Sequence, residues 1–349
     1  MARRTPVRCL VAAATAGIAL LAPAGPVGAA PGAGAAALPQ ARIFMVNPVQ
    51  STGDQSLTDQ RDSASAVPDS AYTLAELRNL DASGRLSGRW AYVRSETGAP
   101  AAVSAAASYD RSDDQFEQVM AYFWVNEAQE YLQGLGFGSE LPGANDRRQA
   151  VRINQWGRDN SFFRDRRGEI RYGKGGVDDA EDAEVIVHEY GHAVHQAQVP
   201  GFGSSREAGA IGEAFGDYLA VEVGEHAVEA YGWPRRADLA CVADWDSVPY
   251  TPAPHCLRRV DGGKVYGDLE GEVHADGEIW SRALFDIRNA LGARTADRII
   301  INAQFGFAPG TSFRDAALTT IETARRMYGD TQADAVRAAF AARQIPGVA

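Results

Sequence analysis

Two histidines four residues apart, His188 and His192, most constrain how this 349-residue chain can fold. In an α-helix this spacing places both side chains on one face, where their imidazoles can hold one metal ion. The preceding segment, DDAEDAEVIV, supplies carboxylates for the first turn of a helix and then an apolar run suited to burial. Glu189 follows the first histidine and flanks the same face. The segment therefore predicts a buried helix that carries a metal site with a carboxylate beside it.

A third ligand is needed, because a catalytic zinc ion has three protein ligands and keeps one position for water. Glu213 is the candidate, and it lies in a second helical pattern together with Asp217, four residues further on. We expect His188, His192 and Glu213 to hold one zinc ion, with Glu189 taking a proton from the zinc-bound water. Asp217 shares the face of Glu213 and is predicted to accept the free ring N–H of a ligating histidine.

The chain divides into regions that differ in amino-acid composition and residue pattern. Residues 1–30 have a basic start, an apolar run and a small-residue end, as a secretory signal peptide does, and the Ala-, Gly- and Pro-rich residues 31–45 suit a flexible linker. Short apolar stretches between turn residues predict a β-rich N-terminal subdomain, or a short pro-region, over 46–110. We expect a central region, 111–225, with an edge strand and the zinc-binding helices, and a C-terminal helical subdomain over 226–349.

The periodicity of apolar residues predicts an α+β fold. An edge strand and a hairpin are expected within 153–176, where aromatic and β-branched residues alternate with charges and glycines. An irregular region with two cysteines is expected near 233–270. The predicted helices are 113–134, 179–197, 206–222, 275–291, 295–303, 312–327 and 331–343.

Charge and cysteine content narrow the class of protein. A net charge of −11 disfavours a nucleic-acid-binding surface. The apolar run near the N-terminus is too short for a membrane anchor, and no later segment looks like one, so we expect an extracellular protein, as a monomer. Cys9 leaves with the signal peptide, and the two remaining cysteines, Cys241 and Cys256, are predicted to form a disulfide in an oxidising compartment. Two unpaired buried thiols are the alternative.

Five carboxylates immediately precede the zinc-binding helix. As hard oxygen ligands they can bind calcium. A helix start exposed to solvent is the arrangement that we expect, and a calcium site is the alternative. The residues are Asp178, Asp179, Glu181, Asp182 and Glu184.

The segments HEYGHAVH and AGAIGEAFGD resemble the two zinc helices of the thermolysin and fungalysin group of gluzincin peptidases, and the bacterial fungalysin-like branch in particular. The resemblance covers about residues 110–290. It implies a zinc cleft between a β-rich N-terminal and a mainly helical C-terminal subdomain. It also implies that Asn160 and Ser161, in an edge-strand segment, bind the substrate backbone. His274, just ahead of a helix, would then stabilise the tetrahedral intermediate.

Two positions depart from the thermolysin pattern. Gly212 replaces an asparagine that supports a zinc histidine, and no tyrosine stands near Ser204, where thermolysin has a second oxyanion donor. The resemblance implies a secreted zinc endopeptidase acting on peptides or proteins, with a small apolar pocket at the cleavage site. Two alternatives stay open: a secreted binding module that has lost turnover, and a zinc exopeptidase, which needs an acidic group that captures the substrate's amino terminus.

Overall fold

The computed structural model describes residues 37–234 and 238–348. The predicted signal peptide and most of the predicted linker lie outside these residues. None of the described helices is long and apolar enough to cross a bilayer. The strands are β1 (Gln40–Phe44), β2 (Tyr72–Glu76), β3 (Ala91–Ser95), β4 (Gln149–Ile153), β5 (Phe162–Arg164), β6 (Glu169–Arg171), β7 (Cys241–Val242) and β8 (Arg258–Arg259). The helices are α1 (Pro48–Thr52), α2 (Asp114–Gly134), α3 (Ala183–Gln198), α4 (Arg206–Ala230), α5 (Val273–Leu291), α6 (Ala293–Gln304), α7 (Phe313–Tyr328) and α8 (Asp330–Ala342).

The described strands form three small sheets. β1 and β2 are an antiparallel pair, and β7 pairs with β8. The largest sheet has the order β3-β4-β6-β5, so β5 lies at its edge and forms an antiparallel hairpin with β6. This hairpin confirms the edge strand predicted within 153–176. β4 was not predicted, although every second residue of its sequence QAVRI is buried, because the strand directly follows a long polar loop.

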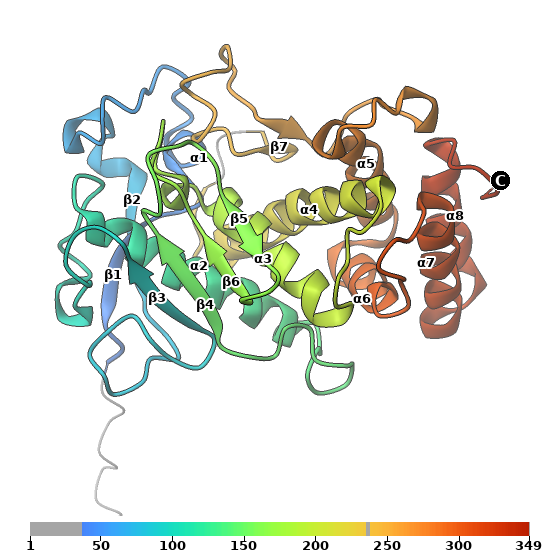
Figure 1. The fold of residues 1–349 in the computed structure, drawn as a ribbon, viewed down its shortest axis with the longest axis horizontal. Helices are drawn as coiled ribbons and strands as arrows, with labels where there is room; N and C mark the ends of the chain where they lie inside the picture. The colour runs from blue at the N-terminus through green and yellow to red at the C-terminus, as the bar shows by residue number, and fades with distance from the viewer. Residues whose placement is uncertain (1–36, 235–237, 349) are drawn as a thin grey trace, which may run out of the picture. The chain divides into compact units, whose positions relative to one another are not determined.

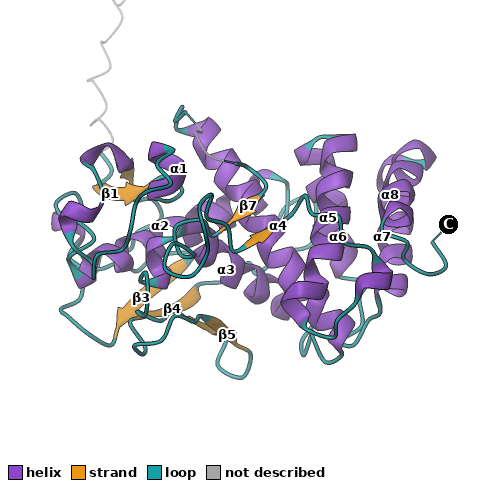
Figure 2. Ribbon diagram, turned by 90° about the horizontal axis from the view of Figure 1, so that it is seen from above, coloured by secondary structure: helices purple, strands orange, loops and turns teal. Residues whose placement is uncertain are grey.

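Helix α2 packs against β3, β4 and α3, and α3 packs against α4. Beyond β8 the chain is mainly helical, and α5 to α8 gather at the end of the molecule opposite β1 and β2 (Figures 1 and 2). The α+β fold class is therefore confirmed. Three predicted helices are longer than expected: α4 continues to Ala230, α5 begins at Val273, with Glu272 as its N-cap, and α6 spans Ala293–Gln304.

The expected solvent-exposed start of the zinc-binding helix is wrong, because all five carboxylates before and in the first turn of α3 are buried. The side chain of Asp182 caps α3 by accepting a hydrogen bond from the backbone N–H of Glu184 (2.9 Å) and another from that of Asp246 (3.1 Å). Glu181 is paired with the buried guanidinium of Arg111 at 2.8 Å. Asp246 and Arg111 come from distant parts of the chain, and they replace water around the acidic run.

Candidate metal centre

Helices α3 and α4 approach each other closely because both carry glycine where they meet. A Cβ atom on Gly216 would lie 2.6 Å from Nδ1 of His188, and one on Gly191 would lie 2.9 Å from Cα of Gly216. Real Cβ atoms essentially never come within 3.0 Å of another heavy atom. The two glycines therefore allow the histidines of α3 and the carboxylates of α4 to reach one point.

Three potential ligands converge at that point. Nε2 of His188 lies 3.2 Å from Oε2 of Glu213, and Nε2 of His192 lies 3.6 Å from Oε1 of the same carboxylate. One ligand atom from each residue lies within 4.8 Å of the other two. Two imidazole nitrogens and one carboxylate oxygen are the ligand set of many catalytic zinc sites. Oε2 of Glu213 and Oε2 of Glu189 are buried without a hydrogen-bond partner, so the site also fits a metal ion and a water molecule.

A buried ion pair stands behind His188. Oδ1 of Asp217 lies 2.8 Å from Nδ1 of His188, which favours a proton on Nδ1 and leaves the Nε2 lone pair for a metal. Arg258 donates to both oxygens of Asp217, from Nε and Nη2, each at 2.7 Å. Burial raises the pKa of Asp217, but Arg258 and His188 outweigh it and hold that pKa well below its usual range.

The two histidines differ in their support. Burial lowers the pKa of His188, but its hydrogen bond with Asp217 and the nearby carboxylate of Glu213 prevail and raise that pKa to about 10. Burial dominates at His192 and lowers its pKa to about 4. The position of a Cβ on Gly212 lies 3.8 Å from Nδ1 of His192, and no hydrogen bond from the described residues reaches that ring. Gly212 therefore leaves Nδ1 of His192 without a side-chain partner among the described residues.

Glu189 and His274 flank the three potential ligands. Glu189 is buried, and burial raises its pKa to about 8 although His188 lowers it. Nε2 of His274 lies 3.3 Å from Oε2 of Glu213, and its Nδ1 lies 2.7 Å from Oε1 of Glu272. His274 lies in the first turn of α5 and not ahead of it, as expected from the sequence, because Glu272 caps the helix two residues earlier.

Two cavities open beside these residues. The larger, of about 480 Å³, is walled by β5, α3 and α4, and the smaller has a volume of about 210 Å³. Asn160, Ser161, His188, Glu189 and His274 line both. The structure thus brings together all the residues that the sequence analysis assigned to catalysis, metal binding and substrate binding, with Asp217 directly behind them.

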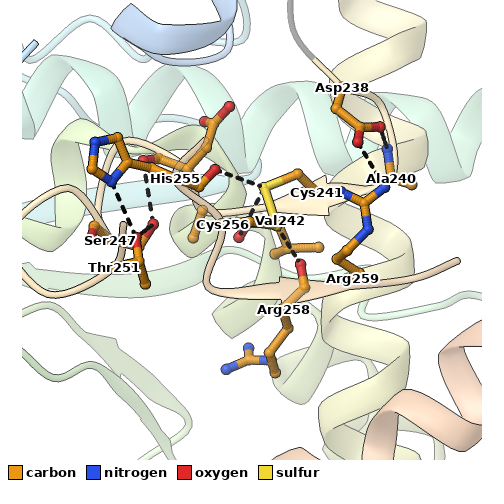
Figure 3. Close-up of a disulfide and its surroundings, with 12 residues drawn as sticks. Asp238, Ala240, Cys241, Val242, Ser247, Thr251, His255, Cys256, Arg258 and Arg259 are labelled. Atoms are coloured by element: carbon orange, nitrogen blue, oxygen red, sulfur yellow. Dashed lines mark hydrogen bonds and ion pairs between the residues drawn. A yellow bond between two sulfur atoms is a disulfide. The ribbon is translucent and has the colours of Figure 1, made fainter. Parts of the chain in front are cut away.

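Arg258 is a site residue that the sequence analysis missed. It lies in β8, opposite Val242 of β7, and the predicted disulfide between Cys241 and Cys256 is confirmed, with 5.5 Å between the two Cα atoms. Figure 3 shows the disulfide beside this pair of strands, with the side chain of Arg258 directed away from the sulfur atoms. The only sequence signal was an arginine two residues after a paired cysteine.

Comparisons with known proteins agree with this geometry. Residues 171–295 match the family model of the fungalysin metallopeptidases, and residues 249–345 match that of the α-helical domain of thermolysin metallopeptidases. Bacillolysin from Bacillus amyloliquefaciens is 24% identical over 175 residues, which cover 45% of this chain and 30% of that protein. The chain thus spans under a third of the length of this relative. The precursor of protealysin, a metalloproteinase from Serratia proteamaculans, has a similar fold, with a TM-score of 0.58 at 18% identity over 78% of this chain and 91% of that one.

In its α+β fold, its matched segments and its potential ligand set, the chain resembles the metallopeptidase class. Within residues 171–345, the chain is similar to the fungalysin and thermolysin metallopeptidases.

Proposed function

We propose that this chain is a secreted endopeptidase that depends on one zinc ion, held by His188, His192 and Glu213, and that hydrolyses peptide bonds in proteins or peptides. The observation that carries the proposal is the convergence of these three side chains within 4.8 Å, with the buried carboxylate of Glu189 beside them. The ion would act as a Lewis acid, polarising the scissile carbonyl and lowering the pKa of water toward about 7.

Glu189 has the position of a general base. Its Oε2 is buried without a hydrogen-bond partner, so it can accept a proton from the attacking water and then deliver it to the leaving amine. Asp217 acts indirectly, by fixing the ring of His188 through Nδ1.

His274 is the proposed donor to the oxyanion of the tetrahedral intermediate. Its Nδ1 lies 2.7 Å from Oε1 of Glu272 and its Nε2 faces the ligand cluster, so Nε2 is the ring nitrogen that can donate to the oxyanion. Loss of one such donor costs roughly 10²- to 10³-fold in turnover.

Asn160 and Ser161 are proposed to align the substrate. They directly precede β5, whose outer edge has no partner strand among the described residues, and they line both cavities. A substrate in extended conformation can therefore add to β5 as a further strand, held by main-chain hydrogen bonds.

The test uses the purified protein beside a Glu189→Gln variant, with zinc content and casein cleavage measured for both. We expect about one zinc per chain in each, cleavage by the parent alone, and loss of cleavage with a chelator. Metal in both proteins without cleavage by the parent would favour the binding module. Chelator-insensitive cleavage, or full activity of Glu189→Gln, would refute the mechanism.

Secretion and calcium binding complete the proposal. The disulfide between Cys241 and Cys256 supports an oxidising compartment. The carboxylates of Asp182, Glu184 and Asp244 offer oxygen atoms within 4.8 Å of one another, which supports calcium as a structural ion. Added calcium is expected to raise the melting temperature of the zinc-loaded protein, and an unchanged melting temperature would remove calcium from the proposal.

A further inference from the structure

The smaller cavity has the position of a subsite for a substrate side chain. Its lining includes His188, Glu189 and His274, and also Asn160 and Ser161. A residue next to the scissile bond of a bound peptide can therefore place its side chain in this space of about 210 Å³.

Three aspartates give the cavity an acidic lining. Oxygen atoms of Asp159, Asp179 and Asp246 lie within 4.8 Å of one another. Asp179 accepts a hydrogen bond from the hydroxyl of Ser161, and Asp246 accepts one from the hydroxyl of Tyr250 at 2.6 Å. The remaining oxygen of each of these two aspartates, Oδ1, is buried and has no hydrogen-bond partner.

These buried acceptors have no ion-pair partner among the described residues. Asp179 and Asp246 are only 2% and 4% exposed, and burial raises the pKa of both, that of Asp179 to about 7. Arg258 also lines the cavity, but its guanidinium is bound by Asp217. An apolar side chain would leave the two free oxygens desolvated and unpaired, whereas an ammonium or guanidinium group would pair with them. The small apolar pocket that the resemblance implied does not fit this lining.

The edge strand β5 indicates which side of the scissile bond the cavity receives. The smaller cavity lies beside Asp159, ahead of β5, and the larger one lies beside Phe162, Phe163 and Asp165, at the strand and past its end. Strands pair antiparallel two to three times as often as parallel. In an antiparallel substrate, the C-terminal part would lie beside Asp159, so the smaller cavity would receive the residue after the cut.

We propose that the smaller cavity is an acidic specificity pocket that admits the lysine or arginine side chain of the residue immediately C-terminal to the scissile bond. This proposal rests on the proposed peptidase function, since it names the substrates of the same site. Asp179 and Asp246 bind the cationic group, and Asp159, which is exposed, attracts it at the mouth. The opening onto Glu189 and His188 favours a substrate side chain over a bound metal ion.

The test compares blocked peptides of one sequence that differ at a single internal residue, lysine, arginine or norleucine. We expect cleavage immediately before lysine or arginine, with kcat/KM at least about tenfold above that for norleucine. Asp179→Asn and Asp246→Asn should each lower kcat/KM for the lysine peptide by about 10- to 10²-fold, because each removes a hydrogen bond to a charged group. Both should therefore lower the ratio of kcat/KM for the lysine peptide over the norleucine peptide. Asp334→Asn, an exposed carboxylate on α8, is the matched control that should alter neither.

A binding measurement distinguishes failure of the pocket proposal from failure of the peptidase proposal. It also tests the pocket if the aspartate variants fold poorly. The Glu189→Gln protein should bind the labelled lysine peptide more tightly than the norleucine peptide. If the parent cleaves no peptide but this difference in binding is found, the peptidase function fails and the cationic pocket stands. Equal or better cleavage of norleucine, or cuts after lysine, would overturn the pocket while hydrolysis stands. Calcium that competes with the lysine peptide, and loses affinity in Asp179→Asn, would show a metal site instead.

Discussion

Replacing Gly216 by alanine tests whether the close approach of α3 and α4 builds the metal centre. The added Cβ would lie 2.6 Å from Nδ1, 2.8 Å from Cε1 and 2.9 Å from Cγ of His188, about 0.5 to 0.8 Å short of the 3.4 Å at which ordinary contact begins. The ring cannot move away freely, because Asp217 holds Nδ1 at 2.8 Å. Either the ring or α4 must shift. Overpacking of this kind costs roughly 1–3 kcal/mol.

The expected result is a loss of both stability and metal affinity. We predict a drop of about 1–3 kcal/mol in the free energy of unfolding by urea, measured on the zinc-free protein. Zinc affinity, measured by competition with a coloured chelator, should fall at least about 10- to 100-fold, as when the support of a ligating histidine is removed. Gly134→Ala is the control, since a Cβ at the last residue of α2 meets nothing within 4 Å. A Gly216→Ala protein as stable as Gly134→Ala, with unchanged zinc affinity, would refute the reasoning.

Three further predictions test the surroundings of the centre. Asp217→Asn should lower zinc affinity by about 10- to 100-fold and destabilise the fold by roughly 3–5 kcal/mol, because it leaves the guanidinium of Arg258 without its carboxylate. Chelator competition measures the zinc affinity and urea unfolding measures the stability. If neither quantity changes, the proposed role of the ion pair is wrong. Replacing Cys241 and Cys256 together by serine should cost roughly 3 kcal/mol, since the disulfide closes a loop of 15 residues; a reducing agent should destabilise the parent by a similar amount and leave the variant unaffected. Raising the pH through about 7 ionises Asp179, whose pKa burial raises to about 7, so the ratio of kcat/KM for lysine over norleucine should increase across that range. Asp159, Asp246, Glu184, Tyr250 and Arg258 face the same cavity, and a flat ratio would contradict the role of Asp179.

The sequence was sufficient wherever the determinant is local. The spacing of His188 and His192, and the capping carboxylates before them, belong to one helix, so periodicity alone places both rings on one face. The same holds for Glu213 and Asp217 in α4. The distance between these helices was not predictable from periodicity. It depends on Gly191 and Gly216 meeting at the crossing, and their importance is evident only from the positions a Cβ would occupy.

The acidic run before α3 shows why local interpretation fails. By composition it is a polar helix start, and water would be its expected environment. Its burial depends on Arg111, 70 residues earlier, which pairs with Glu181, and on Trp245, 64 residues later, whose indole N–H donates to the same carboxylate at 3.2 Å. No pattern within a helical turn encodes such partners.

Segment 241–258, which contains the loop 241–256 closed by the disulfide, connects the two parts of the site that the sequence did not indicate. Asp246 and Tyr250 lie within the loop between the cysteines, and Arg258 follows the second cysteine by two residues. One segment thus supplies both the cation that holds Asp217 behind the zinc ligand His188 and part of the acidic wall of the smaller cavity. Loss of the disulfide should therefore weaken metal binding and the discrimination between lysine and norleucine together. Gly216→Ala should weaken metal binding and leave the preference intact, because the aspartates lie outside α4.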